Sequence, residues 1–323
     1  MADASFENIP SLDLEDFRSG NKDKRTKFVA ELGNAFNNVG FVAIKNHGLS
    51  DELRNQLYDS IQKFFSLPEE IKKQYDKPEL HGQRGYTSKG KEHAKGRTTG
   101  DLKEFFQIGQ IVEDNDPIKS RYPDNLWPSE VEGMEKYASQ TYKTLESAGQ
   151  QILKAVALYL ELPEDYFDAK VHYGNSILRA IHYFPIENPD AIPSDAVRAA
   201  EHGDINLITL LMGASAEGLE IKRRDGKWFP VTALPDQIVV NVGDMLARLT
   251  NDKLKSTIHR VVNPPKEKMK TSRYSIPFFL HPRSEMDLTC LQTCVSEENP
   301  KKYTDMTAGE FLDERLAEIG LKK

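Results

Sequence analysis

Cysteine is scarce in this chain, and its scarcity excludes a class of fold. The 323 residues include two cysteines, Cys290 and Cys294. Two thiols cannot form the framework of a disulfide-stapled protein, and no nearby cysteine or histidine completes a structural zinc set with them. We therefore expect both thiols to be reduced and to have a structural role.

Long apolar runs and an excess of positive charge are also missing. No stretch approaches the roughly 20 apolar residues of a membrane-spanning helix, and the N-terminal residues lack the basic and apolar pattern of a secretion signal. The formal net charge is −7, whereas nucleic-acid-binding proteins normally carry a basic face. These absences predict a cytoplasmic protein with neither a membrane nor a nucleic acid as partner, and we expect a monomer.

The first 172 residues mix helical and strand patterns. Apolar residues recur at helical spacing between 28 and 64, interrupted by a strand pattern at 40–44. The longest helix is predicted to open at the capping-box sequence 129–132 and to end before Pro163. Residues 81–100 are rich in glycine and basic side chains, which indicates a loop, either a lid over a site or a solvated connection.

After Tyr173 the apolar period becomes that of strands for roughly 100 residues. Strands are predicted at 177–183, 206–212, 218–222, 227–231, 237–242, 257–262 and 273–280. Short strands separated by turn signals favour a jelly roll or sandwich over a βαβ fold. We expect one mostly β protein with α decoration, and we divide it into an α/β N-terminal region (1–120), a scaffold helix and connection (121–172), a jelly-roll core (173–285) and a C-terminal helical segment (286–323).

A histidine and an aspartate, His202 and Asp204, immediately precede the predicted strand 206–212. If both belonged to a strand, their side chains would point to one face. His259, roughly 55 residues later, would complete a 2-His-1-carboxylate set, which holds Fe(II) and leaves three coordination positions open. The His-x-Asp pair is weak evidence by itself, because with eight histidines about 0.4 such pairs are expected by chance.

Arg273 and Ser275 alternate along the apolar strand pattern at 273–280. A buried arginine is costly unless an anion meets it, and its planar fork matches a carboxylate. A serine hydroxyl on the same strand face can add a second hydrogen bond to that anion. Two interpretations stay open at this point, an acidic side chain of the protein or a small carboxylate ligand.

Taken together, these motifs resemble the Fe(II) and 2-oxoglutarate-dependent dioxygenase superfamily, in the branch similar to isopenicillin N synthase. The resemblance spans nearly the whole chain. Its motifs are Gly40-Phe41 with Asn46-His47-Gly48, Arg84-Gly85-Tyr86 with Asp101-Leu102-Lys103-Glu104, His202-x-Asp204, Ser256-Thr257-x-His259-Arg260-Val261 and Arg273-Tyr274-Ser275-Ile276-Pro277-Phe278-Phe279.

The resemblance implies a double-stranded β-helix core with iron held by His202, Asp204 and His259. It implies that Arg273 and Ser275 bind the distal carboxylate of 2-oxoglutarate. Tyr183 matches a family tyrosine that contacts this cosubstrate, although Ile181 stands where plant members carry an asparagine. The implied reaction consumes O2, converts 2-oxoglutarate to succinate and CO2, and hydroxylates, desaturates or cyclises a small molecule.

The substrate itself is less well determined. Strand phase and family position indicate four contact residues, namely Tyr86, Phe106, Leu210 and Phe279. The basic stretch at 84–97 indicates an acidic small molecule, such as an amino acid or another small acid. Two alternatives to the 2-oxoglutarate-dependent enzyme stay open: an iron oxidase of the same branch whose Arg-x-Ser binds a different carboxylate, and a non-catalytic jelly-roll binding protein.

Overall fold

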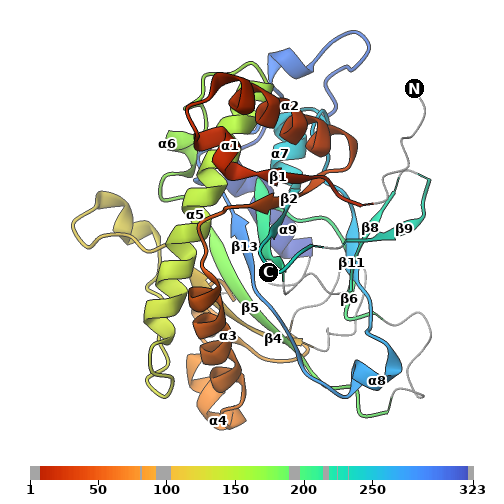
Figure 1. Ribbon diagram of the computed structural model, residues 1–323. Helices are drawn as coiled ribbons and strands as arrows, with labels where there is room; N and C mark the ends of the chain where they lie inside the picture. Colours follow the sequence, from red (N-terminus) through yellow and green to blue (C-terminus); the bar gives the residue numbers. More distant parts are fainter. Residues whose placement is uncertain are drawn as a thin grey trace.

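Two β-sheets packed face to face form the centre of the protein (Figure 1). The computed structural model describes residues 8–80, 82–91, 103–188, 197–213, 218–223, 225–231 and 233–318. The strands in these residues are β1 (Ser11–Asp13), β2 (Phe41–Lys45), β3 (Gly85–Thr87), β4 (Lys103–Gly109), β5 (Ile177–Tyr183), β6 (Ala199–His202), β7 (Ile208–Met212), β8 (Leu219–Lys222), β9 (Trp228–Pro230), β10 (Ile238–Val242), β11 (His259–Val261), β12 (Arg273–Ser275) and β13 (Pro277–Leu280).

The larger sheet has the strand order β1-β2-β10-β7-β13-β5-β4-β3, with β12 also paired to β5, and the smaller sheet has the order β6-β11-β8-β9. An apolar cluster between the sheets joins Leu219 and Ile221 of β8 to Phe41 of β2. The same cluster contains Val239 of β10, whereas Val240 belongs to the core on the other face of the larger sheet. Two facing sheets of mostly antiparallel strands confirm the predicted fold class.

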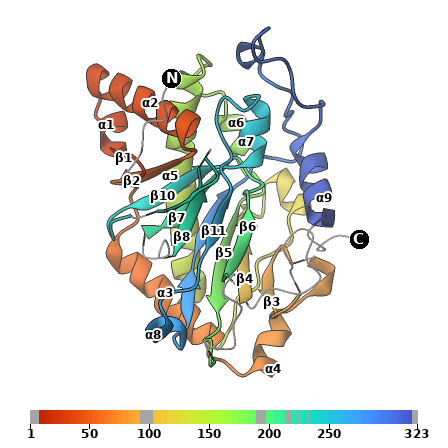
Figure 2. The same cartoon turned by 90° about the vertical axis from the view of Figure 1, so that its right-hand side faces the viewer.

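Helices cover the outer face of the larger sheet (Figures 1 and 2). The α-helices of the described residues are α1 (Leu14–Arg18), α2 (Lys22–Asn38), α3 (Asp51–Phe65), α4 (Glu69–Lys72), α5 (Met134–Tyr159), α6 (Asp168–Val171), α7 (Asp244–Leu249), α8 (Lys266–Met269) and α9 (Ala308–Glu318). The 26-residue α5 packs on β7 and β13, and α2 and α3 pack on α5. None of the helices in these residues has the length and apolarity needed to cross a membrane.

The start of α5 differs from the sequence prediction. The helix begins at Met134, after Gly133 with a φ of 79°, and not at Ser129. The Tyr75 hydroxyl accepts a hydrogen bond from the Ser129 backbone N–H (3.2 Å) and donates one to the Glu130 carboxylate (2.7 Å). Tyr75 thus occupies the Ser129 N–H that a capping box would bond to Glu132, and the chain turns once more before the helix begins.

Two strand predictions are also corrected. Gly85–Thr87, predicted to lie in a loop, forms β3 because it pairs with β4 at the edge of the larger sheet; residues 81 and 92–100 lie outside the described residues. The predicted strand 273–280 is divided at Ile276 into β12 and β13. Strands β1 to β4 join the same sheet as the later strands, and the boundaries of the four sequence segments stay a prediction.

Leu210 lies in the core between the larger sheet and α5. Its side chain is 0% exposed, and a Cβ built on Gly149 of α5 would lie 3.4 Å from its Cδ1. The same Cβ would clash with Cδ1 of Leu280 in β13, so the glycine lets α5 approach the sheet closely. Phe106 of β4 lies in the same core, with its ring centroid 4.8 Å from that of Phe64 in α3.

We expect Leu210→Ala to lower the free energy of unfolding by about 2–5 kcal/mol, since it leaves a cavity in a rigid core. Urea denaturation followed by circular dichroism measures this change. Leu234→Ala is the matched control: Leu234 is 54% exposed, so its truncation should change stability by less than about 0.5 kcal/mol. Equal effects of the two substitutions would contradict the assignment of Leu210 to the core.

Candidate metal centre

Three side chains with metal-ligating atoms meet where the chain passes from one sheet to the other. His202 ends β6 and His259 begins β11, and the two are directly paired across these strands. Asp204 follows in the connection from β6 to β7, which crosses from the smaller sheet to the larger. His202 and Asp204 do not share a strand, because β6 ends at His202. The crossing of the chain, and not strand alternation, brings the carboxylate to the imidazoles.

The ligating atoms of these residues are close together. Oδ1 of Asp204 lies 3.7 Å from Nε2 of His259 and 4.0 Å from Nε2 of His202. The three atoms all lie within 4.8 Å of one another, and the imidazole centroids are 4.5 Å apart. Three donors at this spacing can bind a single ion.

Backbone carbonyls orient both imidazoles. Nδ1 of His202 lies 2.7 Å from the Ala200 carbonyl oxygen, and Nδ1 of His259 lies 3.2 Å from that of Thr257. A carbonyl oxygen can only accept a hydrogen bond, so Nδ1 is the donor in each ring. The Nε2 lone pair is then directed at Asp204, the state in which an imidazole binds a metal.

The two oxygens of the Asp204 carboxylate have different surroundings. Oδ2 accepts hydrogen bonds from the Thr209 hydroxyl (2.7 Å) and the Asn241 side-chain amide (2.8 Å). Oδ1 is the oxygen that faces the imidazoles. The sequence analysis missed Thr209 and Asn241; the available signal was a single polar residue inside each of the apolar strands 208–212 and 238–242.

Burial and then the neighbouring His259 lower the pKa of His202 to about 4, although 46% of its side-chain surface is exposed. Burial alone would raise the pKa of Asp204, but the two histidines and the hydrogen bonds from Asn241 and Thr209 lower it overall. At neutral pH, His202 is therefore an unprotonated base and Asp204 an anion. Both are in the protonation state that metal binding requires.

A row of residues on the larger sheet faces the same space. Lys103, Tyr183 and Arg273 are directly paired neighbours on β4, β5 and β12. Thr209, which holds Asp204, is paired with Phe279 of β13, and Phe279 is paired with Ile177 of β5. Tyr183 lies six residues after Ile177 on the same face of β5, so the row faces the side of the sheet that bears the cluster. The Arg273 guanidinium carbon lies 5.0 Å from the centroid of the Tyr183 ring. Ser275, on the same strand face as Arg273, is buried.

The four predicted substrate contacts divide between the two faces of the larger sheet. Thr209 faces the cluster, so Leu210 points to the opposite face. Phe106 and Tyr86 belong to the same helix-covered core as Leu210, and the prediction that these three line the substrate pocket is wrong. Phe279 is paired with Thr209 across β13 and β7 and so faces the side of the cluster.

The basic stretch at 84–97 does not present all its charges to solvent. Arg84 is 1% exposed and packs over the backbone of β4. Lys91 forms an ion pair with Asp76 (2.5 Å). Residues 92–97 lie outside the described residues.

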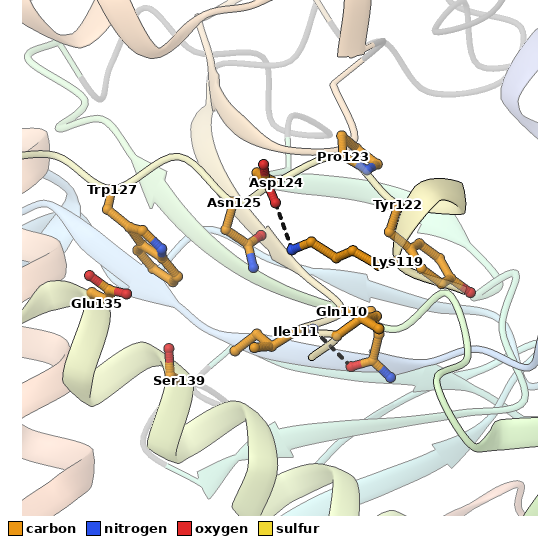
Figure 3. A pocket seen from close by; sticks show the side chains of 11 residues that line it. Gln110, Ile111, Lys119, Tyr122, Pro123, Asp124, Asn125, Trp127, Glu135 and Ser139 are labelled. Carbon is orange, nitrogen blue, oxygen red and sulfur yellow. Dashed lines mark hydrogen bonds and ion pairs between the residues drawn. The ribbon is translucent and has the colours of Figure 1, made fainter. Parts of the chain in front are cut away.

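A separate recess of about 280 Å³ opens beside the N-terminal end of α5 (Figure 3). Its walls come from residues 110–112, Lys119, residues 122–125, Trp127, and Glu135 and Ser139 of α5. Lys119 and Asp124 form an ion pair there (2.7 Å). His202, Asp204 and His259 do not line this recess. This recess is therefore separate from the histidine and aspartate cluster.

Comparisons with known proteins agree with this fold and donor set. The family model described as the 2OG-Fe(II) oxygenase superfamily matches residues 174–282, and the model described as the N-terminal region of non-haem dioxygenases in morphine synthesis matches residues 9–130. The chain is 33% identical to proline hydroxylase buaE of Petromyces alliaceus, over 95% of this chain and 98% of that protein.

Two solved structures give the same result. A 2OG-Fe(II) oxygenase family protein from Caulobacter crescentus is 42% identical with a TM-score of 0.86, and the match covers 96% of this chain and 99% of that one. A full-length protein of Neurospora crassa, solved in complex with alpha-KG and thymine, is 30% identical with a TM-score of 0.84, over 97% and 98% of the two chains.

The fold and the comparisons define an Fe(II)- and 2-oxoglutarate-dependent oxygenase. The chain belongs to the 2OG-Fe(II) oxygenase superfamily, as its sequence motifs predicted. It is an oxidoreductase that uses Fe(II), 2-oxoglutarate and O2 on a small molecule. Membership therefore favours this function over the two alternatives left open by the sequence, the 2-oxoglutarate-independent oxidase and the non-catalytic binding protein.

Another buried histidine gives the protein a pH-dependent stability. His281 follows β13 and is 9% exposed. Burial lowers its pKa to about 4, while Asp204 and Arg179 act on it with opposite signs. Because the folded-state pKa lies below that of the unfolded chain, low pH favours the unfolded state. This contribution to stability is complete above about pH 6.5 and is lost as the pH falls towards 4.

We expect the protein, treated with a chelator, to lose about 2 kcal/mol of unfolding free energy between pH 7.5 and 5 from His281 alone. His202 contributes in the same direction. Urea denaturation at both pH values measures the loss, and His281→Gln should show a smaller dependence on pH than the unaltered protein. Identical pH dependence in the two proteins would contradict a neutral, buried His281.

Proposed function

We propose that His202, Asp204 and His259 are the ligands of Fe(II) in this oxygenase. The division of the Asp204 carboxylate carries the proposal: Thr209 and Asn241 bind one oxygen, and the other is directed at two imidazole nitrogens. Two histidines and one carboxylate suit Fe(II) and leave positions open for reactants. A structural zinc site would instead be closed by four ligands.

Arg273, Ser275 and Tyr183 form the proposed site for the distal carboxylate of 2-oxoglutarate. Arg273 and Ser275 share the face of β12 that is directed to the interior, and Tyr183 is paired with Arg273 on β5. A guanidinium fork can bind both oxygens of a carboxylate, and hydroxyl groups beside it can donate further hydrogen bonds. The row lies on the same face of the larger sheet as Thr209, which holds Asp204. This placement supports the assignment, because one dicarboxylate must reach both the row and the metal.

Bound Fe(II) supplies the activation of O2, coupled to the decarboxylation of 2-oxoglutarate to succinate and CO2. The residues of the chain bind and orient the reactants. Arg273 and Ser275 fix one end of the cosubstrate, and the hydrogen bonds to Asp204 keep that ligand from rotating. Phe41, whose ring centroid lies 5.6 Å from that of His259, shields the buried side of the cluster from water.

The proposed substrate is a small acid or amino acid, acted on by a monomer. Three cationic residues, Lys103, Arg179 and Arg273, occupy interior positions on β4, β5 and β12, and Arg273 is assigned to the cosubstrate. The Arg179 guanidinium carbon lies 4.5 Å from the Phe105 ring centroid and 5.5 Å from that of Phe279. Both features support an anionic group on a compact substrate, as does the similarity to a proline hydroxylase.

Thr209→Val is expected to weaken Fe(II) binding about 10- to 100-fold. The substitution keeps the shape of the side chain and removes the hydroxyl that fixes Asp204, so the ligand can turn away from the imidazoles. Anaerobic titration with Fe(II) measures the affinity. Thr209→Ser keeps the hydroxyl and should bind Fe(II) nearly as well as the unaltered protein; equal affinities in the serine and valine variants would contradict the role of this hydrogen bond.

A panel of small molecules tests the substrate proposal. With Fe(II), 2-oxoglutarate and O2 present, proline or another small acid should raise the rate of succinate formation above the rate without substrate. A neutral ring such as thymine is the matched comparison, because the similar Neurospora crassa structure holds it. Stimulation by thymine and by none of the acids would overturn the acidic substrate while leaving the oxygenase assignment intact.

A further inference from the structure

A buried carboxylate lies on the opposite face of the sheet from the candidate iron site. Glu104 is 1% exposed and follows Lys103 in β4, so its side chain points to the helix-covered face. It is paired with His182 on β5, which is paired in turn with Tyr274 on β12. This outer row therefore lies directly behind the interior row that ends in Arg273.

Glu104 accepts three side-chain hydrogen bonds. Its Oε2 accepts from Nζ of Lys72 (2.7 Å) and from the Tyr86 hydroxyl (2.6 Å), and its Oε1 accepts from Nδ1 of His182 (2.7 Å). Lys72 also donates to the carbonyl oxygen of Phe65 at the end of α3 (3.2 Å). Burial alone would raise the pKa of Glu104, but the bonds from His182, Lys72 and Tyr86 lower it overall, so the carboxylate is ionised at neutral pH.

His182 connects this anchored carboxylate to β12. Its Nε2 lies 2.9 Å from the Ser272 hydroxyl oxygen, within hydrogen-bond distance. Its ring stacks on that of Tyr274, with centroids 4.8 Å apart and an angle of 12° between the planes. Ser272 and Tyr274 flank Arg273 in the sequence, so side-chain contacts hold β12 on both sides of that arginine.

The position of strand β12 depends on such side-chain contacts because the strand is short. It contains three residues and, within the described parts of the chain, pairs with β5 alone. Backbone bonds over so few residues fix the strand weakly, and cross-strand side-chain pairs add to its stability. The exact direction of Arg273 matters, because a guanidinium binds both carboxylate oxygens only in the plane of its fork.

We propose that Glu104, acting through His182 and Ser272, positions the cosubstrate-binding strand of this enzyme. The network holds β12 so that Arg273 and Ser275 meet the distal carboxylate of 2-oxoglutarate. The inference rests on the cosubstrate site proposed above. None of the three network residues touches the cosubstrate, so loss of the network weakens 2-oxoglutarate binding and leaves Fe(II) binding unchanged.

Ser272→Ala tests the network at an exposed residue and leaves the buried ion pair intact. The dissociation constant of 2-oxoglutarate, followed anaerobically through the visible charge-transfer band of the Fe(II)-loaded protein, should rise about five- to tenfold, as expected from the loss of one hydrogen bond. The affinity for Fe(II) should not change. Thr271→Ala is the matched control, because this neighbouring hydroxyl donates to the Lys268 carbonyl oxygen instead (2.7 Å) and its loss should leave both affinities unchanged.

A test of the role of Glu104 requires a variant in which the protein still folds. Glu104→Gln alone would leave the buried Lys72 without its counter-charge, which is strongly destabilising. The double variant Glu104→Gln, Lys72→Met removes both charges. We expect it to bind 2-oxoglutarate more weakly and to exchange amide hydrogens faster at residues 272–275, with exchange in β7 and β10 unchanged. A purely structural role would instead raise exchange in all these strands together.

The variant Arg273→Gln distinguishes a failure of the proposed cosubstrate site from a failure of the proposed positioning network. If this variant binds 2-oxoglutarate as tightly as the unaltered protein, the cosubstrate site and the positioning network are both refuted. If Arg273→Gln weakens binding while Ser272→Ala and the double variant leave it unchanged, the network alone is refuted. Weaker binding in all three, with the Thr271→Ala control unaffected, supports both.

Discussion

The two oxygens of the Asp204 carboxylate are assigned to different partners, and the rest of the site depends on this division. Thr209 and Asn241 come from neighbouring strands of the larger sheet and hold Oδ2. Oδ1 is thereby directed at the histidines of the smaller sheet. The carboxylate thus joins the two sheets at the point where the chain crosses between them, and a carboxylate free to rotate could not offer one oxygen to a metal at low entropic cost.

The larger sheet separates two kinds of polar chemistry by strand alternation. Interior positions on β4, β5 and β12 carry Lys103, Tyr183 and Arg273, whereas the next position on each strand carries the Glu104 network on the helix side. A charge on the helix side needs a partner within the protein, and Glu104 has Lys72. Charges on the interior side face the space between the sheets, where the proposed iron and cosubstrate sites lie. In the proposals made above, one face of this sheet binds the cosubstrate, and the network on its other face holds the binding residues in position.

The sequence predicted this site better than it predicted the surroundings. His202 and His259 could be found because metal ligands need particular side chains, and the family motifs preserve them. Three of the four predicted pocket residues lie on the other face of the sheet. Leu210, for example, is one position from Thr209, and a shift of one residue reverses the face. The Glu104 network was missed for another reason. Its partner His182 lies 78 positions away in the chain, and only the register of β4 on β5 brings the two side chains together.

Exposure and charge together determine from which side reactants approach the cluster. Asp204 and His259 are each 7% exposed, whereas 46% of the His202 side chain is open to solvent. Lys103, Tyr183 and Arg273 form a row on the face of the larger sheet that bears Thr209, the residue that holds Asp204. A dianion entering on the open side therefore meets the cationic row as it reaches the cluster, where low dielectric strengthens the attraction.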